Sequence, residues 1–188
     1  AIGGGSTIDL AKAVATLSKS EERSFRTLAT LQQIDRYPLI AVPTTAGTGS
    51  EATKISVLTD SSIQVKYNPG HVDLIPDVAI LDPVLTVNVP KHVTAFTGID
   101  ALTHAIEAYV STKANEVTDF YALQAIRMIS QSIVEAYHHP TNIQARSKML
   151  LGSYYAGLAF SNASTNLAHA MGRAIGTKWN LPHGQNVA

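Results

Sequence analysis

Apolar residues fall into blocks along the chain, and the lengths of these blocks predict first strands and then helices. Residues 39–43 (Leu-Ile-Ala-Val-Pro) and 78–81 (Val-Ala-Ile-Leu) are short, continuous apolar runs, which are typical of buried strands in an α/β sheet. Between them, residues 55–59 and 63–67 flank a polar turn at 60–62, and this pattern predicts a β-hairpin. We therefore expect an α/β arrangement up to about residue 97.

Beyond residue 97 the apolar positions recur with helical spacing. We expect helices over residues 100–109, 115–137, 142–160 and 166–175. The second of these places several apolar residues on one face, as expected for a helix that packs against others: Ala122, Ile126, Ile129, Ile133 and Ala136. The chain therefore divides into an α/β part, residues 1–97, and an all-helical part, residues 98–188.

Two loops rich in small residues follow expected strands. Residues 3–9 read Gly-Gly-Gly-Ser-Thr-Ile-Asp and open a helix, and residues 44–51 read Thr-Thr-Ala-Gly-Thr-Gly-Ser-Glu. A glycine loop at a helix N-terminus offers backbone N–H groups and the positive helix end to a phosphate. The second loop stands at the carboxyl end of a strand, where open α/β sheets bind ligands. The alternative is a plain turn in each case, with Ser6 or Thr7 capping the first helix.

Asp100 and His104 are four residues apart in a segment with helical patterning, so their side chains share one helix face. A carboxylate and an imidazole placed in this way can bind one divalent cation. Two further histidines, His169 and His183, lie near the end of the chain. We expect these four residues to close on one catalytic metal ion; the alternative is that they are ordinary polar residues.

The composition excludes several classes of protein. The chain has 14 basic and 14 acidic residues, which argues against nucleic acid as the main partner because phosphate binding requires a basic surface. Cysteine is absent, so disulfides and thiolate metal sites are excluded, and a cytoplasmic location is compatible. No apolar run is long enough to predict a membrane span. Because the chain begins without Met and stops just after a candidate ligand, we expect a fragment of a longer protein.

Taken in order, the motifs resemble those of the iron-containing alcohol dehydrogenases (group III), which share a fold with dehydroquinate synthase. The resemblance rests on G-G-G-S-T-I-D at 3–9, P-T-T-A-G-T-G-S-E at 43–51, L-I-P-D-V-A-I-L-D-P at 74–83, G-I-D-A-L-T-H-A-I-E-A-Y at 98–109, G-L-A-F-S-N at 157–162, A-H-A-M-G at 168–172 and L-P-H-G at 181–184. It covers nearly all 188 residues, and the ordered set is far more specific than any single motif.

The resemblance implies a dehydroquinate synthase-like fold. An N-terminal dinucleotide-binding α/β part (residues 1–97, lacking its first strands) would precede an all-helical metal-binding C-terminal domain (residues 98–188, lacking its last helices), with the active site between them. The family's metal ligands fall on Asp100, His104, His169 and His183. Its cofactor contacts fall on Gly3, Gly4, Gly5, Ser6, Asp9, Thr44, Thr45, Thr48, Ser50 and Lys66.

The sequence departs from the family pattern at two places. Many relatives carry a further histidine four residues after the third ligand, where this chain has Arg173. An arginine there could bind an anionic group of the substrate, because guanidinium prefers carboxylate or phosphate. In addition, Ser164-Thr165-Asn166 replaces a run of small, mostly glycine residues.

We therefore expect an oxidoreductase that transfers a hydride between an alcohol or aldehyde and NAD or NADP, with Fe²⁺ or Zn²⁺ as Lewis acid. Arg173 is included among the candidate catalytic residues. One alternative is an NAD–metal enzyme similar to dehydroquinate synthase or glycerol-1-phosphate dehydrogenase, and another is a catalytically incomplete metal-binding fragment. We expect a cytoplasmic protein with a small-molecule substrate, and leave a homodimer open.

Overall fold

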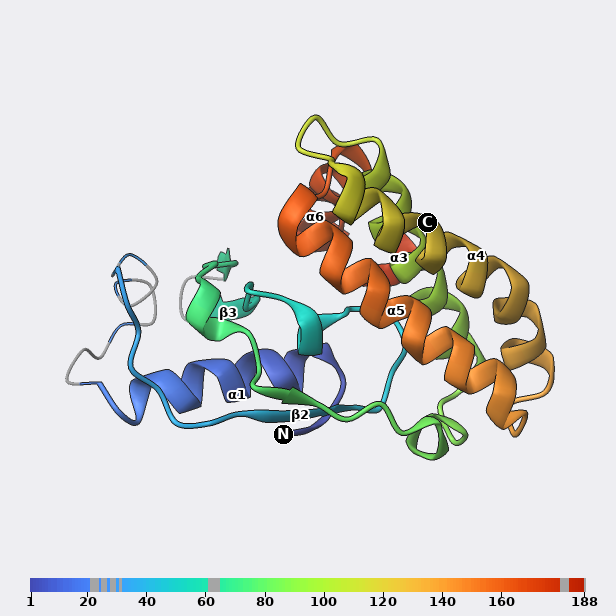
Figure 1. The fold of residues 1–188 in the computed structure, drawn as a ribbon, viewed down its shortest axis with the longest axis horizontal. Helices are drawn as coiled ribbons and strands as arrows, with labels where there is room; N and C mark the ends of the chain where they lie inside the picture. The colour runs from blue at the N-terminus through green and yellow to red at the C-terminus, as the bar shows by residue number, and fades with distance from the viewer. Residues whose placement is uncertain are drawn as a thin grey trace. The chain divides into compact units, whose positions relative to one another are not determined.

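The chain forms two compact units in the computed structural model (Figure 1), which describes residues 1–20, 24, 27, 30, 32–60, 65–179 and 183–187. The first unit comprises residues 1–43 and 50–80, and the second comprises residues 44–49 and 81–188. The expected division after residue 97 falls inside a helix, α3 (Lys91–Tyr109). As a division of function it stays a prediction.

A small parallel sheet forms the centre of the first unit. Its strands are β1 (Ile2–Gly3), β2 (Ile40–Pro43) and β5 (Val78–Ala79), in the order β1-β2-β5. Both strands expected from the apolar runs are present, but β5 is shorter than predicted. It is followed by Asp82, whose side chain accepts a hydrogen bond from the backbone N–H of Val84 and so begins a turn instead of extending the strand.

The α-helix α1 (Gly5–Leu17) follows β1, and β3 (Leu58–Asp60) and β4 (Val65–Tyr67) form an antiparallel hairpin in the same unit. The hairpin is confirmed, although its first strand begins later than expected. Ser56 donates to the carbonyl oxygen of Asp9, and the N–H of Val57 donates to the Asp9 carboxylate. These contacts bind the two residues to α1, although the N–H of Ser56 also donates to the carbonyl oxygen of Pro69. The predicted turn at 60–62 lies largely outside the described residues.

Within the described residues, the α-helices of the second unit are α3 (Lys91–Tyr109), α4 (Glu116–His138), α5 (Ile143–Ala163), α6 (Leu167–Trp179) and α7 (His183–Val187). The first begins nine residues before the expected start at Asp100, so the expectation was wrong there. Gly98 lies inside it and does not break it. A Cβ at Gly98 would come within 2.8 Å of Ile133 Cδ1, so the glycine allows α3 to approach α4 closely.

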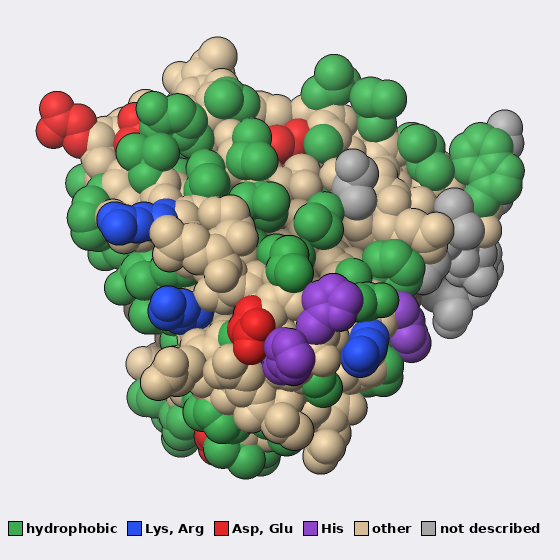
Figure 2. Space-filling model, turned by 90° about the vertical axis from the view of Figure 1, so that its right-hand side faces the viewer, with side chains coloured by type: hydrophobic (Ala, Val, Ile, Leu, Met, Phe, Trp, Pro, Cys, Tyr) green, Lys and Arg blue, Asp and Glu red, His purple; other side chains and the backbone are tan. Residues whose placement is uncertain are grey.

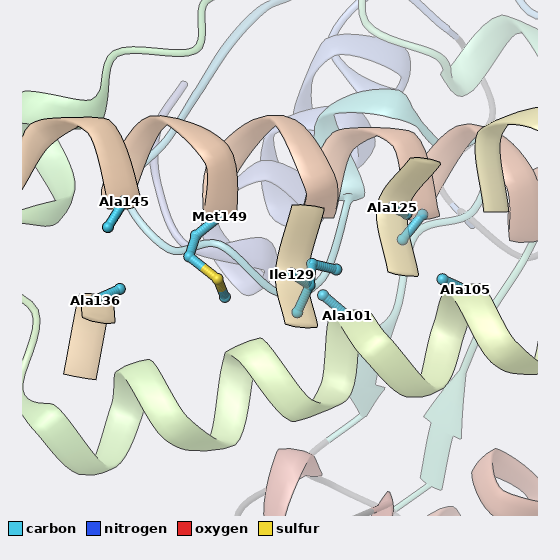
Figure 3. Packing of buried hydrophobic residues seen from close by; sticks show 8 residues of the cluster. Ala101, Ala105, Ala125, Ile129, Ala136, Ala145 and Met149 are labelled. Carbon is cyan, nitrogen blue, oxygen red and sulfur yellow. The ribbon is translucent and has the colours of Figure 1, made fainter. Parts of the chain in front are cut away.

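Short side chains fill the contact between α3, α4 and α5 (Figure 3). The fully or nearly fully buried cluster is Ala101, Ala105, Ala125, Ile129, Ala136, Ala145, Met149 and Ala156. Alanines at these positions let the helix backbones pack at short distances. The core of the second unit therefore lies beside the α3 segment that carries Asp100 and His104.

Many large apolar side chains also remain on the surface, and Figure 2 shows them scattered over one face among polar residues. Phe120 on α4 is 58% exposed and Leu167 on α6 is 69% exposed. Across the described ranges, none of the helices combines the length and apolarity needed to span a bilayer.

Candidate metal centre and cofactor loops

Helix α3 places Asp100 and His104 on one buried face, as their spacing predicts. Asp100 is 2% exposed and His104 is 5% exposed. The ring of Phe160 on α5 stacks on the His104 ring with a centroid distance of 4.1 Å. On the other side, His169 from α6 stacks on His104 at 4.2 Å. Two aromatic neighbours thus hold the His104 ring in one orientation.

His169 and His183 reach the same place from the end of the chain. The Nε2 atom of His169 lies 3.3 Å from Oδ1 of Asp100, and Nε2 of His183 lies 3.7 Å from that oxygen. Donor atoms of Asp100, His169 and His183 all lie within 4.8 Å of one another. The structure therefore brings donor atoms of three predicted ligands close together, and the fourth predicted ligand, His104, lies beside them with its ring stacked on His169.

The protonation of Asp100 and His104 suits metal binding. Burial lowers the pKa of His104 to about 4, so its imidazole is neutral at neutral pH. Burial alone would raise the pKa of Asp100, but the neighbouring histidines, His104 first and then His169 and His183, bring it below its ordinary value. A neutral imidazole and an ionised carboxylate are the forms in which these side chains bind a metal ion.

Three buried atoms of this cluster, within the part of the chain that the structure describes, have no hydrogen-bond partner: Asp100 Oδ1, His104 Nδ1 and His169 Nε2. A buried polar atom left unpaired costs about 1–3 kcal/mol. A divalent cation held by Asp100, His169 and His183 would satisfy the Asp100 and His169 atoms, and one carboxylate with imidazole nitrogens is a suitable ligand set for Fe²⁺ or Zn²⁺. The residues present therefore fit the metal that the sequence predicts.

His183 is the most exposed member of the cluster, with 43% of its side chain accessible. It opens the short helix α7, which packs on α3. Thr103 Oγ1 on α3 donates to the carbonyl oxygen of Val187 at 3.3 Å. Gly184 lies against the backbone of Phe96 so closely that any Cβ would collide with it. The glycine of the Leu-Pro-His-Gly motif therefore permits the approach that brings His183 to Asp100.

Glu107 is a residue of this site that the sequence analysis missed. It is 6% exposed, and its Oε2 lies 2.7 Å from Nδ1 of His169. The signal was present, because Glu107 follows His104 by three residues and Asp100 by seven and so shares their helix face. In the sequence, Glu107 was only one letter of the motif at residues 98–109, and its carboxylate was not considered as a functional group.

Other polar residues considered in the sequence are exposed. Arg173 is exposed on α6, one helical turn after His169. His138 and His139 are exposed at the C-terminal end of α4, as expected for residues at a helix end.

The first predicted cofactor loop lies where β1 passes into α1. Gly4 is the N-cap of α1 and no side chain caps the helix, so the suggested capping by Ser6 or Thr7 is wrong. Gly3 has φ +156°, and a Cβ there would lie 2.7 Å from Thr7 Cβ. Backbone N–H groups at this helix end are not covered by a capping side chain and remain suitable for a phosphate. Gly3, Gly4, Gly5 and Ser6 all belong to this turn.

The second loop leaves β2, which is parallel to β1 with Gly3 opposite Pro43. The two loops therefore follow the carboxyl ends of neighbouring strands, the position that favours ligand binding in an open sheet. Thr44, Thr45 and Thr48 are half-buried in the second unit. In that unit Gly49 has φ +60°, and a Cβ there would lie 2.7 Å from Gly157 Cα, so this loop packs directly on α5.

The side chains of Asp9 and Ser50 form hydrogen bonds within the protein. Ser50 Oγ donates to Oδ1 of Asp9, and the N–H of Val57 donates to Oδ2 at 2.9 Å. Both residues are less than 10% exposed. Burial raises the pKa of Asp9, although Lys12 and these hydrogen bonds oppose the rise. Their geometry ties the end of the second loop to α1, so they would support a cofactor site by fixing its backbone.

Lys12 is buried beneath this junction with no exposed surface. Its Nζ donates to the carbonyl oxygens of Thr53 and Ile55 and lies 3.6 Å from Oδ1 of Asp9. Burial lowers the pKa of Lys12 to about 8, against the opposing charges of Asp9 and Glu51. Glu51 is 3% exposed, and burial raises its pKa to about 7. Lys66, the last predicted cofactor contact, is exposed on β4 opposite Thr59.

Comparisons with known proteins agree with this arrangement. Residues 94–188 match the C-terminal domain of the Fe-containing alcohol dehydrogenase family. Residues 1–83 match iron-containing alcohol dehydrogenase. The chain is 48% identical over 185 residues to the probable alcohol dehydrogenase EutG of Escherichia coli, covering 98% of this chain and 47% of that protein.

Two solved structures are similar over nearly the whole chain. A 1,3-propanediol oxidoreductase superposes with a TM-score of 0.94 at 41% identity, covering 99% of this chain and 49% of the other. The sulfoacetaldehyde reductase of Bifidobacterium kashiwanohense, solved in complex with NAD⁺, gives a TM-score of 0.93 at 37% identity, covering 100% and 50%.

The chain spans about half the length of these relatives. Within that span the expected fold is confirmed, with its α/β part followed by helices. The family matches together cover most of the sequence, and they favour the alcohol dehydrogenase branch over the related synthases. The chain belongs to the iron-containing alcohol dehydrogenase family.

Proposed function

We propose that the protein transfers a hydride between a small alcohol or aldehyde and NAD, with iron held by Asp100, His104, His169 and His183. The observation that carries the proposal is the group of three buried, unpartnered ligand atoms on Asp100, His104 and His169. Membership of an iron-containing family supports iron over zinc. The NAD⁺ complex of a similar reductase supports NAD over NADP.

Each ligand has a separate task in this proposal. Asp100 contributes the negative charge that offsets a divalent cation, and its low pKa keeps that charge in place. His104 contributes a neutral imidazole held between two rings. When bound, the ion supplies Lewis-acid chemistry toward a substrate oxygen. Nicotinamide supplies the hydride chemistry.

We assign dinucleotide binding to residues 1–97 and metal binding to residues 98–188. The glycine turn at Gly3–Ser6 supports the first assignment, since α1 offers backbone N–H groups there without a capping side chain. Asp9 and Ser50 support the site through their mutual hydrogen bond, which fixes Ser50, at the end of the second cofactor loop, to α1. The exposed Lys66 remains a candidate contact to the cofactor.

Arg173 adds a class of compounds to the proposed substrates. By their names, one protein similar to this chain acts on 1,3-propanediol and another acts on sulfoacetaldehyde. Arg173 lies one turn after His169 on α6 and is exposed. A guanidinium on the turn after a metal ligand can bind a carboxylate or sulfonate group. We include aldehydes with an anionic group among the substrates for this reason.

A metal analysis combined with an activity assay tests the proposal. The protein is purified without oxygen, its metals are measured by mass spectrometry, and NAD and NADP reduction is followed with primary alcohols and 1,3-propanediol. Asp100→Asn and His183→Ala should lose bound metal and alcohol oxidation together. Full activity in a metal-free variant would contradict the proposal, and zinc in place of iron would correct the choice of metal.

His139→Ala is the matched control, because His139 is an exposed histidine at the end of α4. This variant should keep both metal and activity. If all three variants lost metal equally, the loss would reflect general damage to the helical unit. The cytoplasmic location and a homodimer stay predictions, which fractionation and ultracentrifugation would check.

A further inference from the structure

Glu107 lies beside the candidate metal centre but is not one of the proposed ligands, so its burial and its contacts require another explanation. Glu107 lies on α3, on the same face as Asp100 and His104, and is 6% exposed. It contacts α6, which lies about sixty residues later in the sequence, through both of its carboxylate oxygens. An acidic side chain is rarely buried to this degree unless its oxygens are paired.

The two oxygens of Glu107 accept hydrogen bonds from different donors. Oε1 accepts from the backbone N–H of Ala168 at 2.6 Å and lies 3.4 Å from the N–H of His169. Oε2 lies 2.7 Å from Nδ1 of the His169 ring. The first contact caps the N-terminus of α6, where free N–H groups need an acceptor. The second contact acts on the imidazole ring itself.

An ionised carboxylate only accepts hydrogen bonds, so Nδ1 of His169 must carry a proton. Oε1 of Glu107 already accepts from the Ala168 N–H, so the carboxylate faces this junction as an acceptor on both oxygens. In the neutral ring the lone pair is then on Nε2, the atom that lies 3.3 Å from Asp100 Oδ1. That atom has no hydrogen-bond partner among the described residues.

We propose that Glu107 is a positioning residue, which fixes His169 in the Nδ1–H form and aims the Nε2 lone pair at the metal. The inference rests on the proposed metal-binding function and adds the group that selects the ligating nitrogen. Carboxylates that hold a metal-ligating histidine in this manner raise metal affinity roughly 10- to 100-fold.

Glu107→Gln tests the proposal at nearly constant size. Glutamine has one oxygen and one NH₂ group, so it can accept from Ala168 or from His169 but not from both. With its NH₂ toward His169, it favours a proton on Nε2 and so blocks the ligating atom. Zn²⁺ affinity, measured by competition with a fluorescent chelator, should fall roughly 10- to 100-fold.

Asn166→Ala is the matched control. Asn166 Nδ2 donates to the backbone carbonyl of Glu107 at 2.8 Å, so this variant weakens the same junction without altering the contact between Glu107 and His169. It should keep the wild-type Zn²⁺ affinity within about twofold, well below the loss expected for Glu107→Gln. An equal loss of affinity in both variants would mean that Glu107 only holds the helices together, and would overturn the inference.

Nitrogen-15 NMR of the histidine rings gives a test that does not depend on variants. In the wild-type protein at neutral pH, Nδ1 of His169 should be protonated both with and without Zn²⁺. A proton absent from Nδ1 would overturn the inference. If the wild-type protein bound no Zn²⁺ or Fe²⁺, the proposed function would fail, whereas the protonation of Nδ1 would still decide the role of Glu107.

Discussion

The Nζ atom of Lys12 donates a hydrogen bond to the carbonyl oxygen of Ile55 at 2.6 Å, with no part of the lysine exposed to solvent. This bond joins the middle of α1 to the chain segment that follows the second cofactor loop. A buried ammonium is costly unless it is paired and fully hydrogen-bonded. The Lys12 ammonium is paired, so its removal should destabilise the contact between α1 and the segment that contains Ile55.

Lys12→Met should lower the free energy of unfolding by about 3–5 kcal/mol, because it leaves Asp9 buried without its cation and two carbonyl oxygens without a donor. Urea unfolding measures the loss, and faster hydrogen exchange at the Val57 amide would locate it. Lys19→Met is the control, since Lys19 pairs with Asp35 at the surface. It should cost at most about 1 kcal/mol. Equal losses in the two variants would contradict the prediction.

Glu51 should make stability depend on pH. Its pKa in the folded protein is raised to about 7 from 4.5, so between these values the folded state holds more protons than the unfolded state. The stability contributed by the protonated form is complete below pH 4.5 and is lost as the pH rises toward 7. The free energy of unfolding should therefore fall over this interval, by about 3 kcal/mol at most.

Glu51→Gln removes this titration and should flatten the profile over the same interval. Unfolding in urea at a series of pH values gives both curves. Lys12 acts in the opposite direction at higher pH, because its pKa is lowered to about 8 from 10.5. Its contribution should make stability rise with pH between those values. Parallel profiles for wild-type and Glu51→Gln protein would show that Glu51 does not titrate as expected.

The sequence was sufficient to predict that Asp100 and His104 lie on one face of a helix, because their helical spacing is fixed; their role as metal ligands stays a prediction. Asp100 and His104 follow from an i, i+4 rule, and any α-helix at that position places them together. Glu107 obeys the same rule but was missed, because its partner is His169 on another helix. A contact between residues this far apart depends on how α3 and α6 pack, and local pattern does not contain that information.

The start of α3 and the roles of Asp9 and Ser50 were not predictable for the same reason. Gly98 looks like a helix breaker in the sequence, yet it is needed where α3 meets Ile133. Asp9 resembles a cofactor ligand, but its carboxylate accepts from Ser50 and Val57. In both cases contacts with distant residues, and not the local sequence, determined the structure.

Ser164 has φ 71° and ψ 170° at the C-terminal end of α5, a conformation that is essentially restricted to glycine. It belongs to the segment that departs from the family's glycine-containing run. Ser164→Gly should raise the free energy of unfolding by about 1 kcal/mol, because the relief of strain exceeds the entropy that glycine loses on folding. Thermal unfolding would measure the change.

Ser130→Gly provides the same exchange at an exposed position inside α4. With ordinary helical geometry there, glycine should lower stability by about 0.5 kcal/mol. Opposite signs at the two serines are the expected result. A loss of stability in both would mean that Ser164 is not strained.

Arg173→Gln should separate anionic from neutral substrates. If the guanidinium binds a sulfonate or carboxylate, KM for sulfoacetaldehyde should rise roughly tenfold, which corresponds to one charge-assisted hydrogen bond of about 1.5 kcal/mol. KM for a neutral aldehyde of similar size should stay unchanged, as should the metal content. Steady-state kinetics with both substrates provide the comparison, and an equal change in both would argue against anion binding.

The alanines between α3, α4 and α5 (Figure 3) have a consequence for how the metal centre could evolve. An alanine has no side-chain rotamers, so this contact cannot absorb a larger neighbour by rearranging. A substitution that enlarges Ala101 or Ala105 must instead separate the helix axes, and α3 would carry Asp100, His104 and Glu107 with it as one body. Preference among metal ions could then change through interhelical spacing alone, while all four ligands keep their identity.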